Sequence, residues 1–348
     1  MKKISTYTVL SIAVILFIRC DNCIKSEEID NSALNNFNII WQDFNRNYPL
    51  FDYYNVNWQE AYDNYVSRIE DTMSADGSDF NKIVSLLLLE LQDYHVYIVP
   101  HSNAFEAFLK NRYDNYFYDI DQVKKYIDTN SVVFDNLIFY AGRITNEYTS
   151  DKTICYVRIK TFLVEKNNEM YSAIDSIFNF LQNSDACIFD IRNNGGGYSY
   201  LRDAIASRII ANEIQYAYEQ YRDGPNATDL TERKVLELKP EISEKYRKPI
   251  ALLVNKLSGS ASEYLTLQLK LAGNVVIIGD TTSGTLSHIE QKRLPNGWRY
   301  NLPVSKVTTL DGICLEGIGI SPDIRVAQTG TSKDTAFFKA LEILSGQR

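Results

Sequence analysis

A serine-rich turn between an apolar run and a helical pattern is the first feature of this chain that could do chemistry. The apolar run that starts at Ile250 leads into Ser258-Gly259-Ser260-Ala261-Ser262-Glu263, and a helix pattern follows. A serine at such a turn would expose its hydroxyl at a helix N-terminus, where the next amide N–H groups are free to hold an oxyanion. The alternative is a simple helix cap, with Ser262 as the N-cap residue.

A second turn carries three consecutive glycines, Gly195-Gly196-Gly197, directly after the apolar run 186–191. Glycine accepts positive φ and lets backbone N–H groups point at an incoming oxygen. This loop could therefore form the other half of an oxyanion hole, or it could be an ordinary tight turn. Nucleotide binding is the weaker interpretation, because the GxxxxGK[ST] and GxGxxG spacings are absent.

Any imidazole base must come from His95, His101 or His288, the three histidines of the chain. His95 ends a structured apolar element, His101 follows a proline in a polar loop, and His288 lies in a loop rich in serine and threonine. Glu316 precedes a glycine-rich turn, and its carboxylate could orient a histidine or accept hydrogen bonds from turn amides. A structural role remains the alternative for each of these side chains.

The elements that must position these residues change character along the chain. Apolar residues recur at helical spacing over 34–91, which predicts two or three amphipathic helices in a small bundle. From Thr153 onward β runs alternate with helices, which predicts an α/β layered core. The polar stretch 222–248 is expected to be an excursion from that core. Helices are expected near 169–181, 200–211, 262–271 and 334–344.

Composition excludes several classes of protein. The chain has 348 residues, of which 45% are hydrophobic and 23% charged, so it can bury a core and is not disordered. Its 36 basic and 44 acidic residues give a net charge of −8, which argues against nucleic acid as a partner. Cys155, Cys187 and Cys314 show no metal-ligand spacing and are expected to be buried thiols, so neither a metal nor a cofactor is predicted.

The first residues have the pattern of an export signal. Lys2 and Lys3 precede the uncharged run Tyr7–Ile18, which is shorter than the roughly 20 apolar residues of a membrane span. This predicts a signal peptide over 1–19 and a polar tether over 20–32 that resembles surface-lipoprotein leaders, with Cys20 as the acylated residue. The expected location is the bacterial cell envelope, either periplasmic or at the outer membrane or surface. Plain secretion and a retained N-terminal anchor are the alternatives.

Six blocks, taken in order, resemble the signature of the C-terminal-processing (tail-specific) serine proteases, a family that includes the tricorn core. They are DYH, YVRIKTF, FDIRNNGGG, LVNKLSGSASE, IIGDTTSGT and EGIGISPDIRV. The resemblance implies a crotonase/ClpP-like ββα spiral core over 153–348, within the α/β (α+β) class, preceded by a small helical bundle over 33–95. The connecting segment 96–152 is short and β-rich, and it leaves no room for a full PDZ domain.

Roles follow from the resemblance residue by residue. Ser260 matches the nucleophile, and the oxyanion donors are the N–H of Ala261 and of Gly196 or Gly197. One branch of the family uses a lysine base where this chain has Thr285, so that dyad is excluded. The tricorn-like branch uses a histidine and a glutamate, which match His95 and Glu316. Tyr94 stands where the tricorn core has a serine and could support the histidine through its hydroxyl.

These assignments predict an exported serine endopeptidase that hydrolyses peptide bonds through an acyl-enzyme on Ser260, with His95 as the general base. Its partner is a peptide or polypeptide substrate, and Cys20 is a possible membrane attachment. A catalytically inactive relative that binds peptide or an apolar ligand in the same cleft is the alternative. An acyl-thioester enzyme of the crotonase type is a third and weaker hypothesis.

Overall fold

A computed structural model describes residues 30–100, 102–103, 121–240, 245–326 and 334–346. The predicted signal peptide, Cys20 and His101 lie outside these residues, as does most of the predicted tether. Within them, no helix has both the length and the apolar character needed to cross a membrane.

A seven-stranded sheet with strand order β13-β9-β8-β5-β4-β3-β2 forms the centre of the fold. Neighbouring strands from β13 to β4 are parallel, and β4, β3 and β2 pair antiparallel. The two middle strands, β5 and β8, are buried along their whole length, as expected for strands covered on both faces. The strands are β2 (Phe134–Asp135), β3 (Phe139–Arg143), β4 (Ile154–Ile159), β5 (Ala186–Asp190), β8 (Ile250–Val254), β9 (Val275–Gly279) and β13 (Ile324–Arg325).

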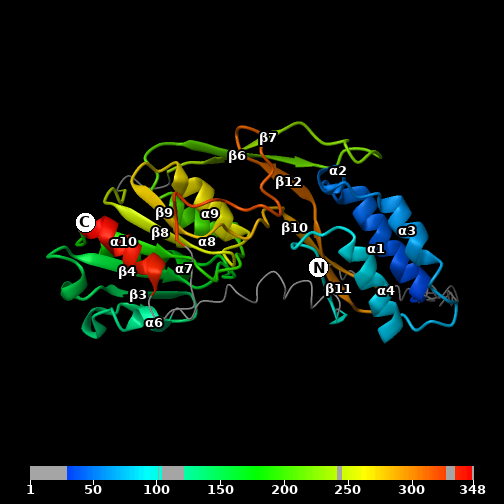
Figure 1. The fold of residues 1–348 in the computed structure, drawn as a ribbon, viewed down its shortest axis with the longest axis horizontal. Coiled ribbons are helices and arrows are strands. Elements are labelled where there is room, and N and C mark those ends of the chain that lie inside the picture. Colours follow the sequence, from blue (N-terminus) through cyan, green and yellow to red (C-terminus); the bar gives the residue numbers. More distant parts are fainter. Residues whose placement is uncertain (1–29, 101, 104–120, 241–244, 327–333, 347–348) are drawn as a thin grey trace, which may run out of the picture. The chain divides into compact units, whose positions relative to one another are not determined.

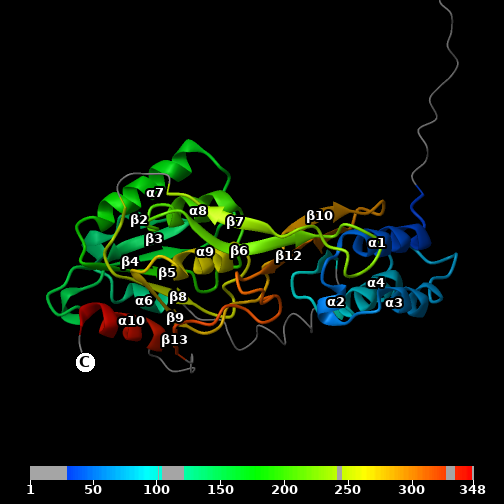
Figure 2. The same ribbon diagram turned by 90° about the horizontal axis from the view of Figure 1, so that it is seen from above.

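Helices cover both faces of this sheet, so each strand contributes alternate side chains to two cores. Cys187 and Phe189 of β5 pack against one set of helices, whereas Ala186 and Ile188 face the other. Figure 2 shows α7 and α8 on one side of the sheet and α10 on the other. The helices are α7 (Asn168–Leu181), α8 (Ser199–Ala206) and α9 (Ala261–Lys270) on the first face, and α6 (Asp121–Lys124) and α10 (Thr335–Ser345) on the second. The predicted mixed α/β class is confirmed.

The N-terminal helices pack around a core of their own, coloured blue and cyan in Figure 1. They are α1 (Ala33–Asn47), α2 (Phe51–Tyr54), α3 (Trp58–Val66) and α4 (Ser78–Leu89). This core includes Trp298, Tyr300 and Leu302, which belong to a hairpin far away in the sequence. The hairpin is part of a three-stranded sheet of β1 (Tyr97–Val99), β11 (Arg299–Pro303) and β10 (Ile289–Arg293).

A second three-stranded sheet has the order β12-β6-β7, with β6 (Ile214–Tyr221), β7 (Lys234–Leu238) and β12 (Ser305–Thr308). The stretch 222–248, expected to be an excursion from the core, contains a strand that the sequence did not predict: β7 lies in it and pairs with β6 outside the seven-stranded sheet. β7 was missed because it is half-exposed and carries charged residues, so it lacks the apolar run that marks the core strands.

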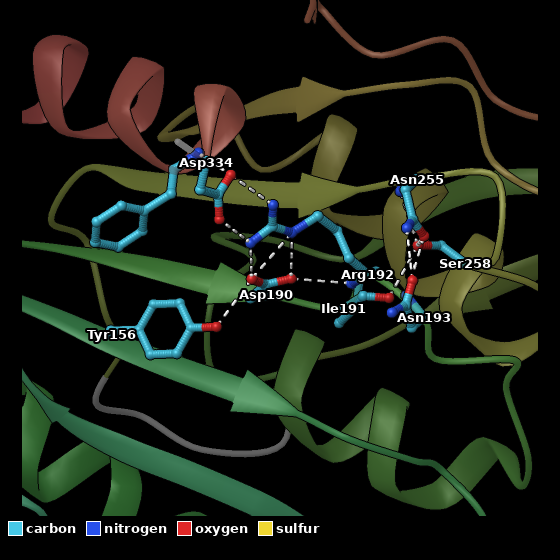
Figure 3. A network of polar contacts seen from close by, with 9 residues as sticks. Tyr156, Asp190, Ile191, Arg192, Asn193, Asn255, Ser258 and Asp334 are labelled. Carbon is cyan, nitrogen blue, oxygen red and sulfur yellow. Dashed lines mark hydrogen bonds and ion pairs between the residues drawn. The ribbon is translucent and has the colours of Figure 1, made fainter. Parts of the chain in front are cut away.

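A buried ion-pair network fixes the end of β5, as Figure 3 shows. Arg192 is 1% exposed; its guanidinium contacts Asp190 at 2.5 Å and Asp334, the N-cap residue of α10, at 2.8 Å. The hydroxyl of Tyr156 also donates to Asp190, at 2.9 Å. The network therefore ties β4, β5 and α10 together directly before the glycine loop.

Replacing Arg192 with methionine would leave two buried carboxylates without their cation. We expect Arg192→Met to lower the free energy of unfolding by about 3 kcal/mol or more, because breaking one side of a buried pair costs that much. Urea unfolding of the variant measures the loss. Arg325→Met is the matched control, because Arg325 pairs with Asp280 while 73% exposed and should cost less than about 1 kcal/mol. Equal losses in the two variants would contradict a structural role for the network.

Candidate active site

Ser260 lies on a strained turn between β8 and α9. Its backbone has φ 50° and ψ −117°, a conformation that side-chain-bearing residues rarely adopt. The helix begins at Ala261, so Ser260 is the N-cap residue, and the interpretation of Ser262 as the cap is wrong. Ser262 instead donates its hydroxyl to the carbonyl of Asn194 at 2.7 Å. The turn thus presents the side chain of Ser260 ahead of the helix N-terminus, as a nucleophile requires.

The carboxylate of Glu263, in the first turn of α9, holds this conformation. It accepts five hydrogen bonds: from the N–H of Ser260 at 3.1 Å, from the hydroxyls of Thr282 and Thr285, and from the N–H of Gly284 and of Thr285. The pKa of Glu263 is raised, because the effect of burial exceeds the opposite effect of these hydrogen bonds. Thr285, at the position of the other branch's lysine, therefore bonds the carboxylate through both its backbone and its hydroxyl.

The glycine loop lies directly against the serine turn. A side chain at Gly196 would come within 2.7 Å of Ser260 Cβ and 2.8 Å of the Ala261 nitrogen, so only glycine allows this approach. The N–H of Gly196 donates to the side-chain oxygen of Asn194 at 3.0 Å. The N–H groups of Gly197 and Ala261 have no partner among the described residues. Of the predicted oxyanion donors, Gly197 and Ala261 are thus the available pair.

His95 lies on the turn that joins α4 to β1, and two buried residues fix that turn. The carboxylate of Asp93 accepts the backbone N–H of His95 at 2.8 Å and the hydroxyl of Tyr48 at 2.7 Å. Asp93 is 3% exposed and Tyr48 is fully buried. Sequence reasoning missed both roles, although an aspartate two residues before the histidine is the spacing of an Asx turn.

Glu316 faces His95 from the other side of the site. Its Oε2 accepts the N–H groups of Leu286 and Ser287 at 2.9 and 3.0 Å, and its Oε1 lies 3.7 Å from Nδ1 of His95. Neither Oε1 nor Nδ1 has a hydrogen-bond partner in the part of the chain that the structure describes, although both atoms are buried. A small movement would join them, and catalytic hydrogen bonds are often long before substrate binds.

Electrostatics keep the His95 imidazole neutral. Burial, with a smaller contribution from the nearby His288, lowers the pKa of His95 to about 4. The side chain is 11% exposed, so the ring is desolvated but still reaches the cavity. A neutral imidazole can accept a proton at neutral pH, as a general base must.

A further hydroxyl lies close to this pair. The oxygen of Tyr54, from α2, is buried and has no hydrogen-bond partner within the described ranges. Burial raises the pKa of this phenol, and the charges of Asp93 and Glu316 raise it further. Sequence reasoning gave Tyr54 no role, because an aromatic residue in a helical pattern is indistinguishable from core.

Ser260 and His95 line one cavity of about 800 Å³. Gly196, Gly197 and Ala261 line it as well, so the structure brings these site residues together from three distant parts of the chain. Tyr94 is half-buried and does not line this cavity, whereas His288 does.

Comparison with known proteins places this site in a family. The profile of peptidase family S41 matches residues 153–326, half of the chain. The chain belongs to peptidase family S41. The profile of the tricorn protease C1 domain matches residues 30–88. The predicted resemblance to the C-terminal-processing (tail-specific) serine proteases, including the tricorn core, is confirmed at the level of the family.

Individual S41 relatives cover different shares of the chain. The carboxy-terminal processing protease CtpA of Bacillus subtilis is 27% identical over 175 residues, which are 50% of this chain and 35% of that protein. The chain thus spans about a third of that relative's length. A candidate peptidase from Parabacteroides merdae has a TM-score of 0.74 at 27% identity, covering 90% of this chain and 96% of its own. The tricorn protease, at 15% identity and a TM-score of 0.58, shares the fold over 91% of this chain and 37% of its own.

The strain at Ser260 predicts an unusual order of stability for the glycine and alanine variants of this residue. We expect Ser260→Gly to be more stable than Ser260→Ala by about 1 kcal/mol, because glycine adopts positive φ without the strain that alanine retains. Urea unfolding measures the difference. Ser262, inside α9, is the matched control: there the glycine variant should be the less stable by about 1 kcal/mol. The same order at both positions would contradict the strained turn.

The buried imidazole predicts an unusual titration. We expect the ring resonances of His95, followed by NMR, to titrate with a midpoint near 4. Because the folded-state pKa is lowered from 6.5, the unfolded chain binds the proton more tightly, so stability decreases as the pH falls from about 6.5 to 4. His95→Gln should lack that decrease. A midpoint at or above 6.5 would show that the charge of Glu316 outweighs burial.

Proposed function

We propose that this chain is a serine peptidase in which Ser260 is the nucleophile and His95 the general base. The observation that carries the proposal is the shared cavity, in which a strained serine, two unpaired backbone N–H groups and a neutral imidazole meet. Membership of peptidase family S41 supports the same reaction class.

The reaction follows from the roles of these groups. Oγ of Ser260 attacks the carbonyl carbon of a peptide bond while His95 takes the hydroxyl proton, and the negative oxygen that forms is held by the N–H groups of Gly197 and Ala261. The C–N bond then breaks as His95 returns the proton to the leaving amine. Water, deprotonated by His95, attacks the resulting ester and releases the acid and free Ser260.

Glu316 is proposed to orient and stabilise the imidazolium. Its Oε2 is committed to the amides of Leu286 and Ser287, which leaves Oε1 to accept Nδ1–H of His95. Once both ring nitrogens of His95 are protonated, the negative charge of the Glu316 carboxylate stabilises the positive imidazolium. Tyr48 and Asp93 act as positioning residues, since they hold the turn and do not contact the reacting atoms.

We further propose that the protein acts outside the cytoplasm, in the bacterial cell envelope. The basic start and the apolar run Tyr7–Ile18 support export, and Cys20 supports a lipid anchor. Cleavage near the C-terminus of a protein substrate is the corresponding proposal for the substrate, prompted by the name of the Bacillus subtilis relative.

Fluorophosphonate labelling with intact-mass readout tests the nucleophile and its base together. We expect a single adduct on the wild-type protein, formed as Ser260 Oγ displaces fluoride from phosphorus. The adduct should be absent from Ser260→Ala, and its rate of formation should be at least about 1,000-fold lower in His95→Ala. Ser176→Ala, which removes an exposed serine of α7, is the control and should label like the wild type.

Two outcomes would count against this proposal. An adduct that persists in Ser260→Ala would place the reactive serine elsewhere. A folded wild-type protein without any adduct would favour the inactive, ligand-binding alternative.

A further inference from the structure

One buried carboxylate in the cavity has no role in the proposed reaction. Glu219, on the middle strand of the β12-β6-β7 sheet, lines the same cavity as Ser260 and is only 7% exposed. Taking a carboxylate out of water costs several kcal/mol unless a cation or hydrogen bonds compensate. Glu219 forms no ion pair among the described residues.

Three tyrosines surround this carboxylate in the cavity. Burial raises the pKa of Tyr221 to about 12, and the neighbouring Glu219 carboxylate adds to that shift. Tyr264 and Tyr216 are also buried, and the charge of Glu219 raises their pKa values as well. All three tyrosines line the cavity, and Tyr264 lies four residues after Ser260, about one helical turn or 6 Å along the axis of α9. Glu219 therefore lies within reach of a long side chain that enters beside the nucleophile.

The other charge on the cavity wall is already compensated. Arg202 of α8 donates through Nε to Asp203 at 2.9 Å, and its guanidinium lies 4.3 Å from the ring centroid of Tyr264. Lys234 is opposite Glu219 on the edge strand β7, but it is exposed and forms no ion pair with Glu219. With Arg202 offset by Asp203, Glu219 is the uncompensated charge of the cavity.

We propose that Glu219 is a specificity residue that selects substrates with a lysine or arginine next to the scissile bond. The aliphatic part of such a side chain would pack against Leu236 and the tyrosine rings, and its cationic head would pair with Glu219. This inference rests on the proposed peptidase function, because it identifies the substrate class of that same cavity.

Cleavage of matched peptides tests the inference. A peptide mixture resolved by mass spectrometry first gives the cleavage positions, and two fluorogenic peptides then differ only in lysine or norleucine before the scissile bond. We expect the wild type to show at least a tenfold higher kcat/KM for lysine, and Glu219→Gln to reduce that ratio to within about twofold of one. Glu237→Gln, which removes an exposed carboxylate of β7, is the matched control and should keep the ratio.

The outcomes separate this inference from the proposed function. Labelling of Ser260 with cleavage that is indifferent to lysine, or a ratio unchanged in Glu219→Gln, would overturn the inference alone. A preference for glutamate that is lost in Arg202→Gln would overturn it in favour of an anion site. If no peptide is cleaved and Ser260 is not labelled, the proposed function fails. In that case two fluorescently labelled peptides that differ only in one lysine or norleucine, measured by anisotropy with Ser260→Ala, test the inference separately. It fails if lysine gives no tighter binding than norleucine.

Discussion

The buried carboxylate of Glu263 is the interaction on which the rest of the site depends. One carboxylate holds the N–H of Ser260 and also the loop that contains Thr282, Gly284 and Thr285. That loop runs on to Leu286 and Ser287, whose amides fix Glu316, and Glu316 faces His95. A single buried carboxylate thus links the strained turn of Ser260 to the loop that fixes Glu316 beside His95. Its burial is tolerable because every acceptor position is used.

Hydrogen bonds to a single residue, Asn194, also hold the glycine loop in place. Asn194 accepts the N–H of Gly196 through its side chain and receives the hydroxyl of Ser262 and the N–H of Gly259 on its carbonyl. These bonds hold the loop against the serine turn, and the N–H of Gly197 has no hydrogen-bond partner among the described residues. Donors that are fixed before substrate arrives need no reorganisation during the reaction, which is the physical basis of an oxyanion hole.

The proposed general base, His95, comes from a different part of the chain than Ser260. His95 follows the helices α1–α4, and the strand after it, β1, pairs with β11. A hairpin from the C-terminal half of the chain therefore helps to fix the position of the turn that carries His95. The core shared by those helices and that hairpin therefore fixes the position of His95. Among the described residues, Nδ1 of His95 and Oε1 of Glu316 are both buried without a hydrogen-bond partner.

The sequence by itself determined the local chemistry: the buried strands, the serine turn, the glycine loop and the histidine and glutamate candidates. These could be predicted because strand, turn and helix propensities act over a few residues and leave a readable pattern. Only the tertiary structure decided that Tyr48 and Asp93 hold the histidine turn. It also decided that, among the described residues, the N–H of Gly197 has no partner and the Glu219 carboxylate in the cavity has no ion pair. These features depend on which polar groups are buried together. That is decided by the long-range packing of half-polar strands such as β6 and β7, which leaves no periodic pattern in the sequence.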